Sequence, residues 1–206
     1  MKRNTVNKAS DFIMSSGVSF AAALFFFVLG ISAGAFTEIM MSDEEKAGFI
    51  SYLDKYFLLA DPNELKFMDI FIGSASNNLG LLFIILISGL SAIGFPVVLI
   101  AMIYKGMALG FSAALLIDSM SFKGIAIVFT SMVPQNLILM PVIIIAGVAA
   151  LNFAFITLRN RRFGFKKSLS ENSGSYLFLN TALALLIIVG CFIESFISPL
   201  LTQLII

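Results

Sequence analysis

The chain has 206 residues, of which 59% are hydrophobic and only 12% are charged, and its formal net charge is +1. Soluble domains average roughly 45–50% apolar and about 25% charged residues. The apolar residues fall in long blocks, so the sequence predicts an integral membrane protein with a single domain over residues 1–206. A net charge close to zero gives no electrostatic reason to expect a nucleic-acid partner.

Histidine is absent from the sequence, and Cys191 is the one cysteine. This composition excludes a disulfide framework within one chain and removes the usual ligands of a zinc or haem site, so we expect neither metal nor cofactor. We also find no nucleophile motif and no nucleotide-binding loop, and we expect no enzymatic activity and no catalytic residues.

The apolar blocks predict an all-α, polytopic membrane bundle with five transmembrane helices. A membrane helix needs about 20 mainly apolar residues. The first block is longer than the apolar region of a typical signal peptide, so we expect it to be retained. A later block, Leu79 to Leu116, is too long for one helix, and the sequence SAIGFP within it can form a turn. The predicted spans are residues 16–36, 79–92, 96–116, 137–158 and 176–197.

The segment 118–136 lies between the third and fourth predicted spans. Its apolar piece is too short to cross a bilayer, so a surface or re-entrant segment is predicted, or a sixth helix if 119–136 penetrates deeply. We expect Pro134 to end this segment. Gln135 or Asn136 would bond the backbone groups freed by the turn, with Asn136 as the better N-cap of the fourth span.

The distribution of positive charge predicts a cytoplasmic N-terminus. Cytoplasmic segments of membrane proteins carry an excess of Lys and Arg, and here basic residues lie before the first span and in the loop 159–175. The mainly acidic loop 37–76 then lies outside. The basic residues in question are Lys2, Arg3, Lys8, Arg159, Arg161, Arg162, Lys166 and Lys167.

An external amphipathic helix is predicted from Ser42 to Phe57. Ser42 and Glu45 have the spacing of a capping box, and acidic residues at the helix start suit the helix dipole. An apolar stripe follows at helical spacing. Two interpretations remain open: the stripe packs on the protein's own spans or on lipid, or it docks a partner. The stripe consists of Phe49, Ile50, Leu53 and Phe57.

Pairs of glycines recur four positions apart in two of the spans. Gly30 and Gly34 lie in the first span, and Gly106 and Gly110 lie in the third. Small residues let membrane helices approach closely and gain van der Waals contact. We interpret these four as contacts within one chain, with homo-oligomerisation as the alternative.

Two ionisable residues fall inside predicted spans. Lys105 lies near the middle of the third span and Glu194 toward the outer end of the fifth, whereas Asp118 is expected at the interface. The depths of Lys105 and Glu194 in the membrane differ by about 13 Å at the helical rise per residue. A salt bridge between them therefore needs tilted helices, a shifted register or a bridging group. Lys105 could instead meet helix-end carbonyls or the amides of Gln135 and Asn136. A buried anchor is one interpretation, and an ion or substrate pathway is the other.

Five stretches together resemble a known family. In their order and spacing they are similar to the stage II sporulation protein M family, membrane proteins of the engulfment machinery of endospore-forming bacteria. The resemblance covers nearly the whole chain, although Met107 stands where phenylalanine is more often expected. The stretches are LGISAGA (29–35), LSAIGFPVVL (90–99), KGMALGF (105–111), VPQNLILMP (133–141) and IESFISP (193–199).

The resemblance implies a non-enzymatic protein of the septal, later engulfing, mother-cell membrane. It implies stage II sporulation proteins P and D, which cut peptidoglycan, as partners, and a scaffold role that localises and organises these hydrolases. The residues themselves leave one alternative, a transporter or permease-like subunit that uses Lys105, Glu194 and the proline-broken segment. We find no convincing internal repeat to support that alternative.

Overall fold

The computed structural model is a bundle of long helices, and it describes residues 17–53, 67–91, 94–159 and 165–197. No strand occurs in these ranges, as the prediction of an all-α membrane bundle requires. The elements in chain order are α2 (Gly17–Ile39), α3 (Asp43–Leu53), α4 (Phe67–Leu90), α5 (Phe95–Ile127), the π-helix η2 (Val128–Met132), α6 (Val133–Arg159), α7 (Phe165–Phe192) and the π-helix η4 (Ile193–Ile197).

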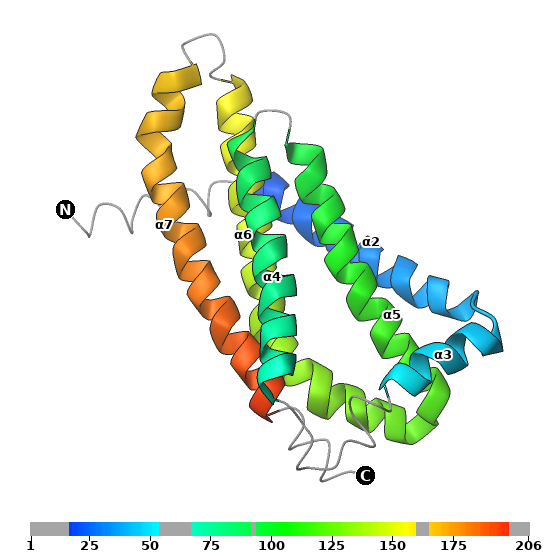
Figure 1. The fold of residues 1–206 in the computed structure, drawn as a ribbon. Coiled ribbons are helices and arrows are strands. Elements are labelled where there is room, and N and C mark those ends of the chain that lie inside the picture. The colour runs from blue at the N-terminus through cyan, green and yellow to red at the C-terminus, as the bar shows by residue number, and fades with distance from the viewer. Residues whose placement is uncertain (1–16, 54–66, 92–93, 160–164, 198–206) are drawn as a thin grey trace.

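Within the described residues, four stretches are long and apolar enough to cross a membrane. One of them, Phe95–Leu158, has 64 residues and would be about 96 Å long as a straight helix, roughly three times the thickness of a hydrocarbon core. It consists of two antiparallel arms, α5 and α6 (Figure 1). The arrangement is therefore that of a multi-pass bundle built from α2, α4, α5, α6 and α7.

Successive long helices alternate in direction (Figure 1). The helices α2, α5 and α7 run toward the end of the bundle where α3 lies, and α4 and α6 run away from it. The connection from α5 to α6 lies at the same end. Following the orientation predicted from the basic residues, we call this the outer end.

Two predicted boundaries are wrong because polar residues occur inside helices. The helix α4 begins at Phe67 rather than Leu79, so the loop 37–76 is shorter than predicted. Ser74 and Asn78 weakened the apolar signal there, yet a helix accommodates them because they bond within the bundle. The helix α7 likewise begins at Phe165, inside the loop predicted over 159–175.

The chain reverses earlier than the sequence suggested. The reversal is at Ser121, the one non-helical position within α5, with φ 49° and ψ −122°. A Cβ at Gly124 would collide with the backbone oxygen of Leu116, so the following segment folds back closely. Residues 122–132 span about 16 Å as a helix, too short to cross a bilayer. Phe122 and Phe129 are exposed on this segment.

The prediction that Pro134 ends a helix is wrong, because the helix continues through it. The N–H of Val133 bonds the oxygen of Val128, five residues back, as in a π-turn. The wider turn of η2 gives the proline ring room that regular α-helical spacing denies it. Asn136 is therefore not an N-cap: it is buried within α6, and its Nδ2 donates to the oxygen of Met132 at 2.8 Å.

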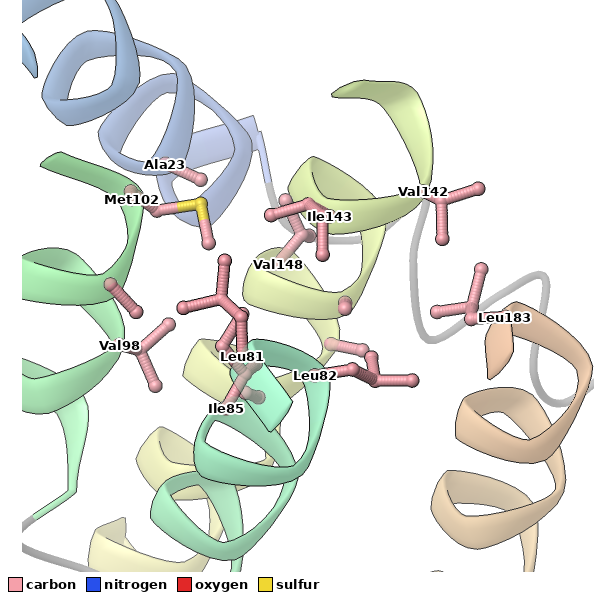
Figure 2. Packing of buried hydrophobic residues seen from close by; sticks show 14 of the residues in the cluster. Ala23, Leu81, Leu82, Ile85, Val98, Met102, Val142, Ile143, Val148 and Leu183 are labelled. Carbon is pink, nitrogen blue, oxygen red and sulfur yellow. The ribbon is translucent and has the colours of Figure 1, made fainter. Parts of the chain in front are cut away.

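The helix α6 lies at the centre of the bundle. Figure 2 shows its Ile143 and Val148 packed among side chains of the neighbouring helices, including Met102 of α5 and Ile85 of α4. Large apolar side chains are instead exposed on the outward faces of α2, α4 and α7. This is the burial pattern of a bundle whose outside meets lipid, and examples of the exposed side chains are Phe25, Phe83 and Leu185.

Several predicted features lie outside the described residues. They are the basic N-terminal segment, Phe57 of the apolar stripe, residues 92–93 of the SAIGFP turn, residues 160–164, and the chain from 198 onward.

Candidate functional site

A chain of polar side chains runs through the bundle from α5, through α4, to η4. Lys105 Nζ donates to Asn78 Oδ1 at 2.7 Å. Asn78 Nδ2 donates to the backbone oxygen of Ser74 at 2.9 Å and to its hydroxyl at 3.3 Å. The Ser74 hydroxyl donates to Glu194 Oε2. We call these four residues the polar chain.

Lys105 and Glu194 were predicted to lie at different depths, so that a bridging group would be needed between them. Asn78 and Ser74 of the polar chain are that bridging group. Ser74 and Asn78 lie four residues apart, on one face of α4, and so can bond both each other and residues of neighbouring helices. Neither residue was predicted, because Ser74 lies in the predicted external loop and Asn78 lies next to it. The available signal was this spacing of two polar residues just before an apolar run.

Every hydrogen bond in the polar chain has its donor on the lysine side and its acceptor on the glutamate side. The bond dipoles therefore align between the two charges, and such chained bonds strengthen one another where the dielectric constant is low. Asn78 is only 3% exposed, so water does not replace these bonds at its position. The neutral residues thus stabilise both charges without a contact ion pair.

One further group borders the polar chain, and the amides predicted as partners of Lys105 bond elsewhere or lie in the first turn of α6. Cys191 is buried, and its sulfur lies 3.9 Å from Asn78 Nδ2. Asn136, which the sequence suggested as a partner of Lys105, donates its amide within its own helix. Pro134 and Gln135 are partly buried in the first turn of α6. Lys105 instead donates to Asn78.

Asn136 also lines a cavity of about 260 Å³ between α2, α5 and the η2–α6 segment. All the other residues that line the cavity are apolar or glycine, so the cavity differs from the polar chain in its chemistry. Those residues are Ile31, Leu109, Gly110, Ala113, Val128, Met132, Val133, Leu137 and Met140.

At the outer end, Lys46 of α3 lies between two carboxylates. Its Nζ is 2.7 Å from Glu38 Oε1 of α2 and 2.7 Å from Asp118 Oδ2 of α5. The Glu38 side chain is 3% exposed and that of Asp118 is 57% exposed. The pKa of Lys46 is raised above its ordinary value, first by the hydrogen bond to Asp118 and to a lesser extent by the hydrogen bond to Glu38. A single lysine therefore links α3 to the end of α2 and to α5 just before its kink at Ser121.

The first turn of α3 forms the predicted capping box. The backbone N–H and the hydroxyl of Ser42 both donate to Glu45 Oε2 at 3.0 Å, and the N–H of Glu45 lies 3.4 Å from Ser42 Oγ. The bond from the Ser42 backbone, followed by that from its hydroxyl, lowers the pKa of Glu45. Local sequence alone therefore defines the start of α3.

Part of the apolar stripe of α3 packs on the protein itself. The ring of Phe49 meets that of Phe111 on α5 edge to face, with centroids 5.4 Å apart. Phe49 nevertheless keeps 48% of its surface exposed, and Ile50 is half-buried. The side chain of Leu53 and all of Phe57 lie outside the described residues.

The four glycines picked out by their spacing lie at the crossing of α2 and α5, within one chain. A Cβ added at Gly30 would be 2.9 Å from Ile103 Cα, and one at Gly34 would be 2.8 Å from the backbone nitrogen of Phe111. From the other side, a Cβ added at Gly106 would be 2.9 Å from the backbone nitrogen of Ile31, and one at Gly110 would be 2.9 Å from Ile31 Cα. The two backbones are thus in direct contact, which a larger residue would prevent.

Antiparallel apolar helices, polar groups paired inside and apolar side chains exposed outside define a multi-pass membrane protein. The family model described as stage II sporulation protein M matches residues 23–199, and the chain belongs to this family of sporulation membrane proteins. The match includes the polar chain, the glycine crossing and α3. No curated protein and no solved structure matches the chain.

Proposed function

We propose that this protein is a non-enzymatic membrane scaffold that localises and organises peptidoglycan hydrolases at the sporulation septum during engulfment of the forespore. The observation that carries the proposal is its membership of the stage II sporulation protein M family. The expected partners are stage II sporulation proteins P and D, and the expected location is the septal and engulfing mother-cell membrane.

The outer end has features that suit a docking platform. A scaffold needs a surface whose position relative to its membrane anchor is constant. The helix α3 meets this requirement because it is held at three contacts. Lys46 pairs with Glu38 of α2 and Asp118 of α5, and Phe49 packs on Phe111 of α5. The exposed part of Phe49 remains available to a partner's extracytoplasmic domain.

Co-purification of the full-length, detergent-solubilised protein with each hydrolase tests the proposal. The wild type is compared with a variant in which Phe49 and Ile50 are changed to Gln. A matched control carries Phe122→Gln, because Phe122 is exposed on the connecting segment at the same end. We expect the wild type and the control to retain the hydrolases and the stripe variant to lose them.

The outcomes separate two claims. Failure of the wild type to bind either hydrolase would refute the scaffold proposal. Normal binding by the stripe variant would leave the scaffold in place and remove only α3 as its docking surface.

A transporter or permease-like role is supported less well. It would use the polar chain, as transporters use buried polar residues at helix interfaces. The side chains of Lys105, Asn78, Ser74 and Glu194 already bond one another, so a substrate would have to break these bonds to bind. The same bonds suit a structural link between three elements.

A further inference from the structure

We propose that the polar chain is a binding site for one exchangeable proton, reached from the outer end of the bundle. This inference concerns the bundle interior and stands or falls independently of hydrolase binding. It rests on the position of the four residues, on the direction of their hydrogen bonds and on the charged groups around them.

The carboxylate end of the polar chain lies nearest to the outer water. Glu194 is in η4, which follows α7 at the outer end, and its side chain is only partly buried. Ser74 lies about 10 Å along α4 from the helix start at that end, and Asn78 about 16 Å, near the middle of a membrane. A proton entering from outside therefore meets the carboxylate first.

A proton bound at Glu194 removes the charge from one hydrogen bond of the polar chain. The hydroxyl of Ser74 accepts from Asn78 and donates to the carboxylate, so its donor and acceptor roles are both in use. A proton from water that joins Oε1 leaves the Ser74 bond to Oε2 in place as a neutral hydrogen bond, and a proton that joins Oε2 makes Glu194 the donor. In both cases the hydrogen bond to a charged carboxylate is lost. The only other change is in charge: the site goes from a balanced pair to a net single positive charge on Lys105.

Few other charges surround the carboxylate. The helices packed against η4 are α4, α6 and α7. The titratable residue of α4 is Asp69, which is exposed, and that of α6 is Arg159, at its far end. On α7, Cys191 is the near titratable group, and Lys105 faces the site from α5. Within the described residues, one cation and one thiol thus determine the local balance.

Binding of the proton should loosen η4 from α4. The bond between Ser74 and Glu194 joins these two elements, and a hydrogen bond to a charged group is the strong kind. Cys191, fully buried one turn before Glu194, provides a built-in reporter because opening of this contact would expose its thiol.

Infrared difference spectroscopy of the full-length protein in lipid nanodiscs tests proton uptake directly. On acidification, the other carboxyl groups give protonated-carboxyl bands in both proteins, and the wild type should gain one further band that Glu194→Gln lacks. Ser74→Ala removes the donor to the carboxylate, so the band should appear at higher pH. Ser76→Ala is the matched control, since Ser76 is exposed on the same helix. Absence of a Glu194-dependent band while the protein stays folded would overturn the proposal, as would identical titrations of Ser74→Ala and the wild type.

Alkylation of Cys191 tests the structural consequence. Because alkylation depends on the thiolate at every pH, the quantity to compare is the ratio of the rates of Glu194→Gln and the wild type. We expect a ratio of about tenfold or more at high pH, where only the wild type has the charged bond, falling toward one on acidification. If Glu194→Gln does not fold, Ser74→Ala takes its place. A ratio that does not change with pH would refute the linkage.

Discussion

Adding one methyl group at Gly106 should loosen the crossing of α2 and α5. The new Cβ would lie 2.9 Å from the backbone nitrogen of Ile31 and 3.2 Å from the carbonyl carbon of Gly30, and closer still to the oxygen of Phe27. All three are backbone atoms, so no side chain can rotate out of the way. Since ordinary contacts begin at 3.4 Å, the helices must separate by about 0.5 Å or more.

The cost of this separation should be about 1–3 kcal/mol, the usual range for overpacking. Alanine is also a better helix former than glycine, by up to about 1 kcal/mol, which would hide part of the effect. Gly80→Ala removes that ambiguity. Gly80 lies in α4 with nothing within 4 Å of an added Cβ, so it carries the propensity gain alone.

Thermal unfolding in detergent measures the difference. A dye that fluoresces on reacting with a thiol reports unfolding through Cys191, the single cysteine, which is fully buried. By the scaling for soluble proteins of this size, Gly106→Ala should unfold roughly 2–12 °C below Gly80→Ala. Equal midpoints would refute the close crossing. A change of oligomeric state at unchanged midpoint would instead favour the glycines as contacts between chains.

Three further predictions concern the outer end. Ser121 has a positive φ, which strains a residue that carries a side chain. Ser121→Gly should therefore raise the unfolding midpoint, and Ser121→Val should lower it. The reverse order would contradict the backbone geometry. Lys46→Met should lower the midpoint more than Asp118→Asn, because it leaves the buried carboxylate of α2 without its cation; equal effects would contradict this ranking. The capping bonds lower the pKa of Glu45 below its ordinary value of 4.5. They therefore stabilise α3 fully at pH values above 4.5, and this stabilisation is lost as the pH falls through the lowered pKa. In carbon-13 NMR, Ser42→Ala should move the titration of the Glu45 carboxyl group to higher pH, and an unmoved titration would contradict the capping bond.

Composition and local spacing determined the features that depend on the solvent or on near neighbours in the chain. Long apolar blocks predict membrane helices because lipid offers no partner to a free backbone group. The capping box of Ser42 and Glu45 was predictable because both partners lie within one turn. The need for a partner at Lys105 was equally evident, since a charge inside a bilayer is costly by itself.

The tertiary structure alone decided which groups meet across helices. The pairing of Lys105 with Asn78, and of Lys46 with Glu38 and Asp118, depends on helix rotation and tilt, which no local pattern encodes. The position of Ser74 inside a membrane helix depends on the same packing, because its hydroxyl finds its acceptor on η4, 120 residues away. A polar residue looks like part of a loop until its partner is known, and that partner exists only in the folded bundle.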